Sequence, residues 1–175
     1  DRGFGLVNAM YAIEAGADRV HGTILGVGER VGNTPLDLLL VNLKLLNIID
    51  TDLSPLGPLV DLVAEATDWT VPVNYPVFGR DAFRTGTGVH AAAVVKALRT
   101  GDNDLADQIY SGVPASWFGR DQEIEVGPMA GKWNVIYWLE THGFESSEQN
   151  VQKILSAAKK SDRLLLTDEL KALLQ

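Results

Sequence analysis

The sequence predicts an α/β protein whose opening part follows the pattern of parallel-sheet folds and whose remainder is mainly helical. A helix, a buried strand, a glycine-rich loop and a second helix succeed one another between residues 6 and 46, the order typical of folds with parallel strands. After Leu56 the pattern is mostly helical with irregular joints. We therefore expect a domain boundary near residue 53, with residues 1–53 as the α/β part and residues 54–175 as the helical part.

The elements of the first part follow from local signals. The first helix is expected over residues 6–15, where apolar residues recur at helical spacing and a glycine follows as a cap. Residues 19–25 (RVHGTIL) are typical of a short buried strand. The second helix is expected to begin at Thr34 as N-cap, with Pro35 at its first helical position. A lone parallel strand has no partner for its backbone hydrogen bonds, so this part implies strands from further polypeptide.

The second part contains a series of shorter helices. Helices are expected over residues 59–66, 89–98, 104–110, 131–141, 146–160 and 167–174. Residues 122–126 (QEIEV) alternate polar and apolar residues as a strand does, and Pro72 and Pro76 indicate an extended segment. Ser146 and Gln149 have the spacing of a capping box at the start of the helix over residues 146–160.

Composition excludes several classes of function. The chain has 23 acidic and 15 basic residues and a net charge of -8. Such a chain repels phosphate backbones, so generic nucleic-acid binding is not expected. The absence of cysteine excludes a disulfide framework and a thiolate metal site. No apolar run reaches the ~18 residues of a membrane span, and the first residues do not resemble a signal peptide. We expect a cytoplasmic protein with no nucleic-acid or membrane partner.

The first candidate site is the loop Gly26–Asn33 (GVGERVGN), between the expected strand and the second helix. Glu29, Arg30 and Asn33 offer an acid/base group, an anion clamp and a neutral oxygen ligand within five positions. In α/β barrels, loops at this end of a strand build the active site. The alternative is a structural turn with Glu29 and Arg30 in solvent. A G-x-G-x-x-G nucleotide motif is rejected because Val31 stands at its sixth position.

The second candidate site is residues 86–90 (GTGVH), which lead into a helix. His90 could shuttle a proton, because the ordinary pKa of histidine lies near neutrality. The structural alternative is that its ring only donates to a nearby carbonyl. His21, beside the expected strand, and His142, at a helix end, are expected to be structural or solvent-facing.

These motifs resemble those of the 2-isopropylmalate synthase and homocitrate synthase family, within the DRE-TIM metallolyase superfamily. Residues 1–3 (DRG) match the end of its H-x-H-x-D-x-G signature, and residues 26–33 match its G-x-G-E-R-x-G-N signature in full. Residues 86–90 resemble its S-G-[IV]-H segment, and residues 109–120 resemble its T-Y-E…G-[RL] segment. The resemblance covers essentially the whole chain. It implies the C-terminal end of a TIM (β/α)8 barrel, followed by a mainly helical linker subdomain.

The resemblance also implies roles for four residues. Asn33 resembles the amide ligand of a catalytic divalent metal, and Glu29 the acid/base carboxylate beside it. His90 and Tyr110 resemble the pair that reaches over the barrel mouth of the partner subunit and assists deprotonation of acetyl-CoA. Two features depart from the family pattern: the segment between His90 and Tyr110 is longer, and Ser111 stands where an acidic residue is common.

The implied reaction is a Claisen-type condensation of acetyl-CoA with a 2-oxo acid, catalysed by a homodimeric acyltransferase of the 2-isopropylmalate synthase type, which serves leucine biosynthesis. The metal could be Mg²⁺, Mn²⁺ or Zn²⁺. Its other ligands, an early aspartate and the histidines of H-x-H, are expected before Asp1. No other cofactor is expected, and neither is feedback by leucine.

The sequence leaves three alternatives. The first is a homocitrate or citramalate synthase, because the side chains that select the 2-oxo acid lie mostly on earlier strands. The second is a barrel aldolase or lyase, which the segment with His90 and Tyr110 disfavours. The third is a non-catalytic helical interaction module. One amide cannot hold a cation that prefers about six oxygen ligands, so we expect residues 1–175 alone to bind metal negligibly and to have no turnover.

Overall fold

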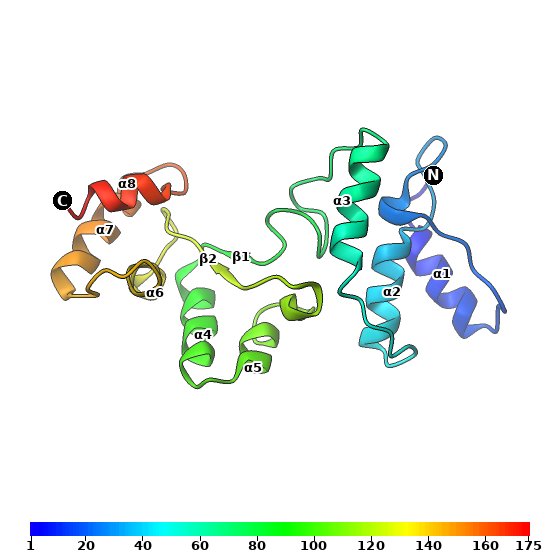
Figure 1. The fold of residues 1–175 in the computed structure, drawn as a ribbon, viewed down its shortest axis with the longest axis horizontal. Helices are drawn as coiled ribbons and strands as arrows, with labels where there is room; N and C mark the ends of the chain where they lie inside the picture. The colour runs from blue at the N-terminus through cyan, green and yellow to red at the C-terminus, as the bar shows by residue number, and fades with distance from the viewer. The chain divides into compact units, whose positions relative to one another are not determined.

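A computed structural model covers residues 1–175 and consists of helices with one small parallel sheet (Figure 1). The elements in chain order are α1 (Gly5–Glu14), the 3₁₀ turn η1 (Ile24–Gly26), α2 (Leu36–Leu45), α3 (Leu56–Ala66), β1 (Arg84–Thr85), α4 (Gly88–Arg99), α5 (Asn103–Gln108), the 3₁₀ turn η2 (Ala115–Phe118), β2 (Glu123–Ile124), α6 (Lys132–Thr141), α7 (Glu148–Lys160) and α8 (Thr167–Ala172). No helix combines the length and apolar character needed to cross a bilayer.

The chain forms two compact units. The first unit comprises residues 1–82 and 115–120, and the second comprises residues 83–114 and 121–175. The short segment that carries η2 therefore belongs to the first unit, although it lies between parts of the second in the sequence. Compact packing units and domains need not coincide, so the boundary near residue 53 stays a prediction.

In the first unit, α1 and α2 pack against each other through Ala9, Leu39 and Leu43, all buried. The predicted first helix is confirmed within one residue at each end. Gly16 follows it with a φ of 93°, a left-handed conformation that favours glycine after a helix. Helix α3 packs against η1.

Residues 19–25 do not form the predicted strand. Thr23 makes only an isolated parallel bridge with Pro35, in which the Thr23 amide donates to Thr34 at 3.0 Å and the Leu36 amide donates to Thr23 at 2.9 Å. A strand is stabilised by a ladder of such bonds, and no other segment runs beside this one to supply them. The prediction is therefore wrong for this structure, because the apolar pattern encodes burial but cannot supply a neighbouring strand.

Two predicted helix starts also differ. Helix α2 has Pro35 as its N-cap rather than Thr34, whose hydroxyl instead donates to Gly5 at 3.2 Å. Helix α7 is capped by Ser147, which accepts from the Asn150 amide, so the capping box predicted at residue 146 is wrong. In both cases two adjacent residues could serve as caps, and the surrounding contacts select one of them.

Residues 72–79 fold into successive tight turns instead of the extended segment that the prolines indicated. The Tyr75 amide donates to Pro72 at 2.9 Å, and the Gly79 amide donates to Tyr75 at 2.8 Å. A Cβ atom at Gly79 would lie only 2.6 Å from the Tyr75 oxygen, so these turns require glycine there. The Arg120 guanidinium donates to two carbonyls of these turns, the nearer at 2.7 Å, and so holds them against the η2 segment of the same unit.

Unexpected strand pairing opens the second unit. The predicted strand over residues 122–126 is confirmed only at its centre, as β2, which pairs in parallel with β1. Sequence patterning did not indicate β1, which has only two residues. Arg84 joins the two strands through ion pairs of 3.0 Å with both Glu123 and Glu125.

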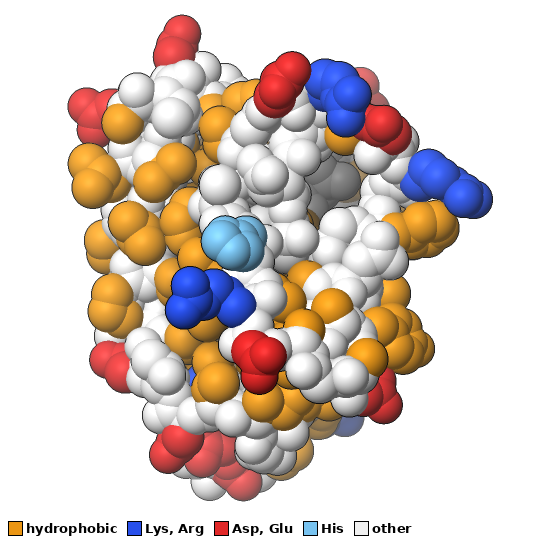
Figure 2. All heavy atoms as spheres, turned by 90° about the vertical axis from the view of Figure 1, so that its right-hand side faces the viewer, with side chains coloured by type: hydrophobic (Ala, Val, Ile, Leu, Met, Phe, Trp, Pro, Cys, Tyr) orange, Lys and Arg blue, Asp and Glu red, His pale blue; other side chains and the backbone are white.

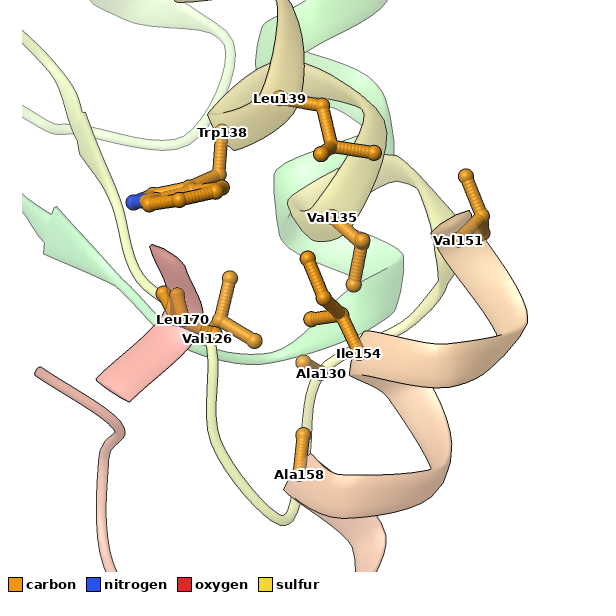
Figure 3. Packing of buried hydrophobic residues seen from close by; sticks show 9 residues of the cluster. All are labelled: Val126, Ala130, Val135, Trp138, Leu139, Val151, Ile154, Ala158 and Leu170. Atoms are coloured by element: carbon orange, nitrogen blue, oxygen red, sulfur yellow. The ribbon is translucent and has the colours of Figure 1, made fainter. Parts of the chain in front are cut away.

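The main core of the second unit lies among α6, α7 and α8. Figure 3 shows buried side chains from these helices converging with Val126 and Ala130 of the segment before α6. Val135, Leu139 and Ile154 are essentially inaccessible to solvent. Full burial of such side chains contributes about 1.5–3 kcal/mol each, so this core is the principal support of the C-terminal helices.

Hydrophobic side chains also remain at the surface, as the face of the molecule in Figure 2 illustrates. In the first unit, an apolar pocket lies beside α1 and α2. Its lining includes Val7, Tyr11, Leu46 and Ile48, all of which are exposed.

Candidate functional site

The loop Gly26–Asn33 closes on itself through backbone hydrogen bonds. The Asn33 amide donates to Gly26 at 2.8 Å, and the Gly32 amide donates to Glu29 at 3.0 Å. Gly26 and Gly32 have φ values of 65° and 85°, which favour glycine. A Cβ atom at Gly32 would overlap the Gly26 carbonyl oxygen. The glycines of the motif are therefore needed for the close approach of the two ends of the loop.

The Asn33 side chain has a defined direction. Its Nδ2 atom donates to the Val27 carbonyl at 3.3 Å, so the amide oxygen is left to accept from, or to coordinate, a ligand. Gly28 lies directly against this carboxamide, and a Cβ atom there would overlap Nδ2. The donor chemistry of Asn33 thus fits one oxygen ligand of a divalent cation.

Glu29 and Arg30 are both exposed at the turn of the loop. Arg30, whose φ is 57°, approaches Asp1 at 3.8 Å, and both side chains are mostly in solvent. Such a surface pair contributes about 0–1 kcal/mol. In this structure the loop therefore directs its two charged side chains into solvent; Asn33 is exposed as well, and it lines an open pocket of the first unit.

An open pocket in the first unit brings together the segment at residues 1–6 and the end of the loop Gly26–Asn33. Residues 1–6 line one side of it and residues 31–35, including Asn33, line the other. The hydrogen bond from the Thr34 hydroxyl to Gly5 joins the two walls. Two motifs about thirty positions apart in sequence therefore share one cavity.

The chain has no group of three or more His, Asp or Glu side chains that could hold a metal ion. Asn33 can supply one oxygen to the pocket, and a cation with about six ligands would need the others from water, substrate or additional polypeptide.

His90 and Tyr110 lie together in the second unit. Their rings stack with centroids 4.1 Å apart and planes inclined by 21°. The Nδ1 atom of His90 is buried and has no hydrogen-bond partner, so it does not make the bond to a carbonyl that a structural role would involve. Tyr110 is 48% exposed, so the ring that stacks on the imidazole is itself partly in solvent.

The start of α4, which carries His90, is held against the start of α6. The Gly88 amide donates to Met129 at 3.0 Å, and a Cβ atom at Gly88 would lie only 2.6 Å from the Gly131 nitrogen. Asn134, fully buried, accepts from the Gly131 amide at 2.9 Å and donates to the carbonyls of Gly86 and Glu125. Glycines and one buried amide therefore fix the turn from which His90 projects.

The other two histidines lie apart from this pair. His21 is exposed, and His142 stacks on Trp138 with ring centroids 4.4 Å apart. The Nδ1 atom of His142 lies 2.8 Å from the Trp138 carbonyl oxygen. Both positions agree with the structural or solvent-facing roles expected from the sequence.

Sequence reasoning missed a buried polar cluster behind the loop Gly26–Asn33. Asp37 is inaccessible to solvent; its Oδ1 accepts from the Leu25 amide at 2.7 Å and its Oδ2 from the Tyr75 hydroxyl at 2.9 Å. Burial raises the pKa of Asp37 above its ordinary range, against the lowering effect of these hydrogen bonds. Burial, reinforced by the Asp37 charge, also raises the pKa of Tyr75. The sequence indicated Asp37 only as an acidic residue near the start of a helix, and no pattern in the sequence indicated a role for Tyr75.

Known proteins similar to this chain define its class. The HMGL-like family, a group with the TIM-barrel fold, matches residues 1–63. A probable 2-isopropylmalate synthase of Methanopyrus kandleri is 33% identical over 161 residues, covering 91% of this chain and 30% of the relative. An (R)-citramalate synthase of Aquifex aeolicus is 32% identical over 164 residues, covering 90% of this chain and 29% of the relative. A homocitrate synthase of Pyrococcus abyssi is 37% identical over 144 residues, covering 82% of this chain and 37% of the relative.

The chain belongs to the family of 2-isopropylmalate, citramalate and homocitrate synthases. It spans about a third of the length of the curated relatives it matches. Relatives of all three substrate classes are similar to it to nearly the same degree, so identity alone does not select the 2-oxo acid.

Proposed function

We propose that the protein carrying this chain condenses acetyl-CoA with a 2-oxo acid to give an alkylmalate-type product. In this proposal, residues 1–53 are the end of a TIM barrel and residues 54–175 are a helical linker subdomain. The observation that carries it is the pocket of the first unit, in which residues 1–6 face residues 31–35 with the Asn33 amide oxygen available. In a barrel, this pocket would lie at the end where active sites are built.

Asn33 is the residue we assign to a divalent metal, Mg²⁺, Mn²⁺ or Zn²⁺. When bound, such a metal would polarise the ketone of the 2-oxo acid as a Lewis acid. The hydrogen bond from Asn33 Nδ2 to Val27 orients the carboxamide so that its oxygen is the coordinating atom. Glu29, four positions earlier on the same loop, is our candidate for the acid/base carboxylate.

His90 and Tyr110 are the pair we assign to acetyl-CoA. In the proposed step, His90 takes a proton from the methyl group, and the methyl carbon of the enolate bonds to the ketone carbon of the 2-oxo acid. The ketone oxygen gains a proton, and water then hydrolyses the thioester to release coenzyme A. Stacking on Tyr110 holds the plane of the imidazole, and because Nδ1 is buried, Nε2 is the nitrogen we assign to proton transfer.

Exposed apolar residues around this pair support a homodimer formed through the linker. Val89 is 78% exposed and Met129 is 67% exposed. Val89 directly precedes His90 in the chain. The Met129 carbonyl accepts a hydrogen bond from the Gly88 amide, two positions before His90. We propose that they contact the partner subunit near its barrel mouth.

A thiol-release assay on the full-length protein tests the proposal. Acetyl-CoA is supplied with 2-oxoisovalerate, 2-oxoglutarate or pyruvate, and we expect turnover with 2-oxoisovalerate, as for an enzyme of leucine biosynthesis. Turnover only with 2-oxoglutarate would make the protein a homocitrate synthase, and turnover only with pyruvate a citramalate synthase. No coenzyme A release with any 2-oxo acid, in the presence of Mn²⁺, would refute the reaction class.

Matched variants test the residues. Asn33→Ala is expected to abolish turnover with little change in melting temperature, whereas Asn42→Ala, which removes a side chain bonded within α2, should leave turnover unchanged. His90→Gln is compared with His142→Gln, because both histidines stack on an aromatic ring in the second unit. His90→Gln should slow turnover about 10²- to 10⁴-fold with less effect on 2-oxo-acid binding. Equal activity of the two histidine variants would remove His90 from the reaction.

A further inference from the structure

The feature that the proposed reaction leaves unexplained is the fully buried carboxylate of Asp37 in the first turn of α2. Taking a carboxylate out of water is costly unless its oxygens are hydrogen-bonded. Here both oxygens have partners from separate parts of the first unit: the Leu25 amide at 2.7 Å and the Tyr75 hydroxyl at 2.9 Å. The carboxylate therefore joins Leu25, the residue that precedes the loop Gly26–Asn33, to the turns at residues 72–79.

The bond to Leu25 acts at a strained position. Leu25 has a φ of 58° and is buried, and a left-handed conformation costs a residue with a side chain about 1–2 kcal/mol. Such a conformation persists only where its surroundings hold it. The Asp37 carboxylate holds the Leu25 amide, and Gly26, the next residue, accepts from the Asn33 amide at 2.8 Å. The path from Asp37 to Asn33 thus has only two intervening residues.

Tyr75 is itself held in place. Its backbone lies in the tight turns at residues 72–79, which Arg120 fastens through two carbonyls at 2.7 and 2.9 Å. The hydroxyl of Tyr75 therefore reaches Asp37 from a turn whose backbone is hydrogen-bonded within itself and to Arg120. The segment after the proposed barrel end consequently reaches back to the loop that bears Asn33.

We propose that Asp37 and Tyr75 are positioning residues, which fix the left-handed turn at Leu25 and through it the placement of the Asn33 side chain. The positioning is a property of the first unit, and only its consequence for turnover rests on the proposed function. Neither residue contacts substrate in this scheme.

The test uses Tyr75→Phe in the full-length protein, because this change removes one hydroxyl and keeps the ring. Tyr11→Phe, at a tyrosine that is 67% exposed in the same unit, is the matched control. Hydrogen–deuterium exchange is measured on peptides covering residues 22–36. A lost bond to a charged group corresponds to about tenfold faster exchange of the protected amides, which we expect for Tyr75→Phe and not for Tyr11→Phe.

Variants of Asp37 provide a second test. Asp37→Asn keeps an oxygen that can accept from Leu25 and should retain most of the protection, whereas Asp37→Leu loses both bonds and should lose it. If Asp37→Leu does not fold, the comparison of Tyr75→Phe with Asp37→Asn still decides the question. Lower melting temperature in Tyr75→Phe with unchanged exchange over residues 22–36 would overturn the proposal, because it would show a structural role alone.

The Mn²⁺ dependence of turnover distinguishes a failure of the positioning role from a failure of the proposed function. With both correct, Tyr75→Phe raises the Mn²⁺ concentration for half-maximal coenzyme A release about tenfold, with a smaller change in KM for acetyl-CoA. Faster exchange over residues 22–36 with unchanged Mn²⁺ dependence would uphold the positioning role and remove Asn33 from the metal site.

Discussion

Replacing Gly28 by alanine should separate the function of the loop from its stability. A Cβ atom at this position would overlap Asn33 Nδ2 and would lie 3.2 Å from Asn33 Cγ and 3.4 Å from Gly32 Cα. The backbone at Gly28 lies outside the left-handed region, so alanine adopts it without strain. The flexible carboxamide must therefore retreat by ~1 Å or more, and a misplacement of ~1 Å in a catalytic group can cost about 10²-fold.

We accordingly expect Gly28→Ala to lower kcat for coenzyme A release about 100-fold while changing the free energy of unfolding by less than ~1 kcal/mol. Both quantities are measured on the full-length protein, by thiol release and by urea denaturation. Gly112→Ala is the control, because a Cβ atom there meets nothing within 4 Å. Wild-type turnover in Gly28→Ala would contradict this expectation, because it would show that turnover does not need the Asn33 carboxamide in its present position.

The remaining predictions concern stability. Gly32→Ala should lower the free energy of unfolding by more than ~2 kcal/mol. Its φ of 85° disfavours alanine, and the added Cβ atom would overlap the Gly26 carbonyl oxygen, a backbone atom that cannot move aside as a side chain can. A denaturation midpoint equal to that of Gly28→Ala would contradict this. Asn134→Ala should cost about 3 kcal/mol in urea denaturation, because three hydrogen-bonding groups lose their partner; a loss under ~1 kcal/mol would contradict it. The hydrogen bond from Arg163, aided by the Leu166 amide, lowers the pKa of Glu169 from 4.5 to about 2. This group stabilises the fold above pH 4.5, and its contribution is lost as pH falls toward 2; melting curves of Glu169→Gln should therefore differ from wild type at pH 6 and converge with it near pH 2.

Local patterns predicted the helices well and the pairing of distant segments poorly. The apolar spacing of α1 and the alanine-rich run of α4 gave their positions within one or two residues, because helix hydrogen bonds close within the segment. The strand expected over residues 19–25 failed because its bonds must come from another strand. Strand β1 was not predicted for the same reason, since two residues have no pattern until β2 lies beside them.

The same difference holds for the candidate site: contiguous motifs could be found from the sequence, and contacts between distant residues could not. The loop Gly26–Asn33 could be singled out because its glycines and polar residues are contiguous. His90 and Tyr110 were paired only through the family resemblance, because about twenty residues separate them and their contact depends on how α4 and α5 pack. The bond between Asp37 and Tyr75 spans 38 positions and had no signal, because a tyrosine among prolines is an ordinary turn residue until its hydroxyl is placed.

The buried amide of Asn134 explains why the C-terminal helices matter to the proposed chemistry. Asn134 belongs to α6, whose neighbours Val135 and Leu139 form the core with α7 and α8. The same side chain bonds to Gly86, at the start of the segment that ends in His90. A loss of core packing around α6 would shift Asn134, and Asn134 would release the turn on which His90 depends. The helices after residue 131 therefore act on the proposed site through this amide and through the packing of α6 against α4, although none of them contributes a side chain to it.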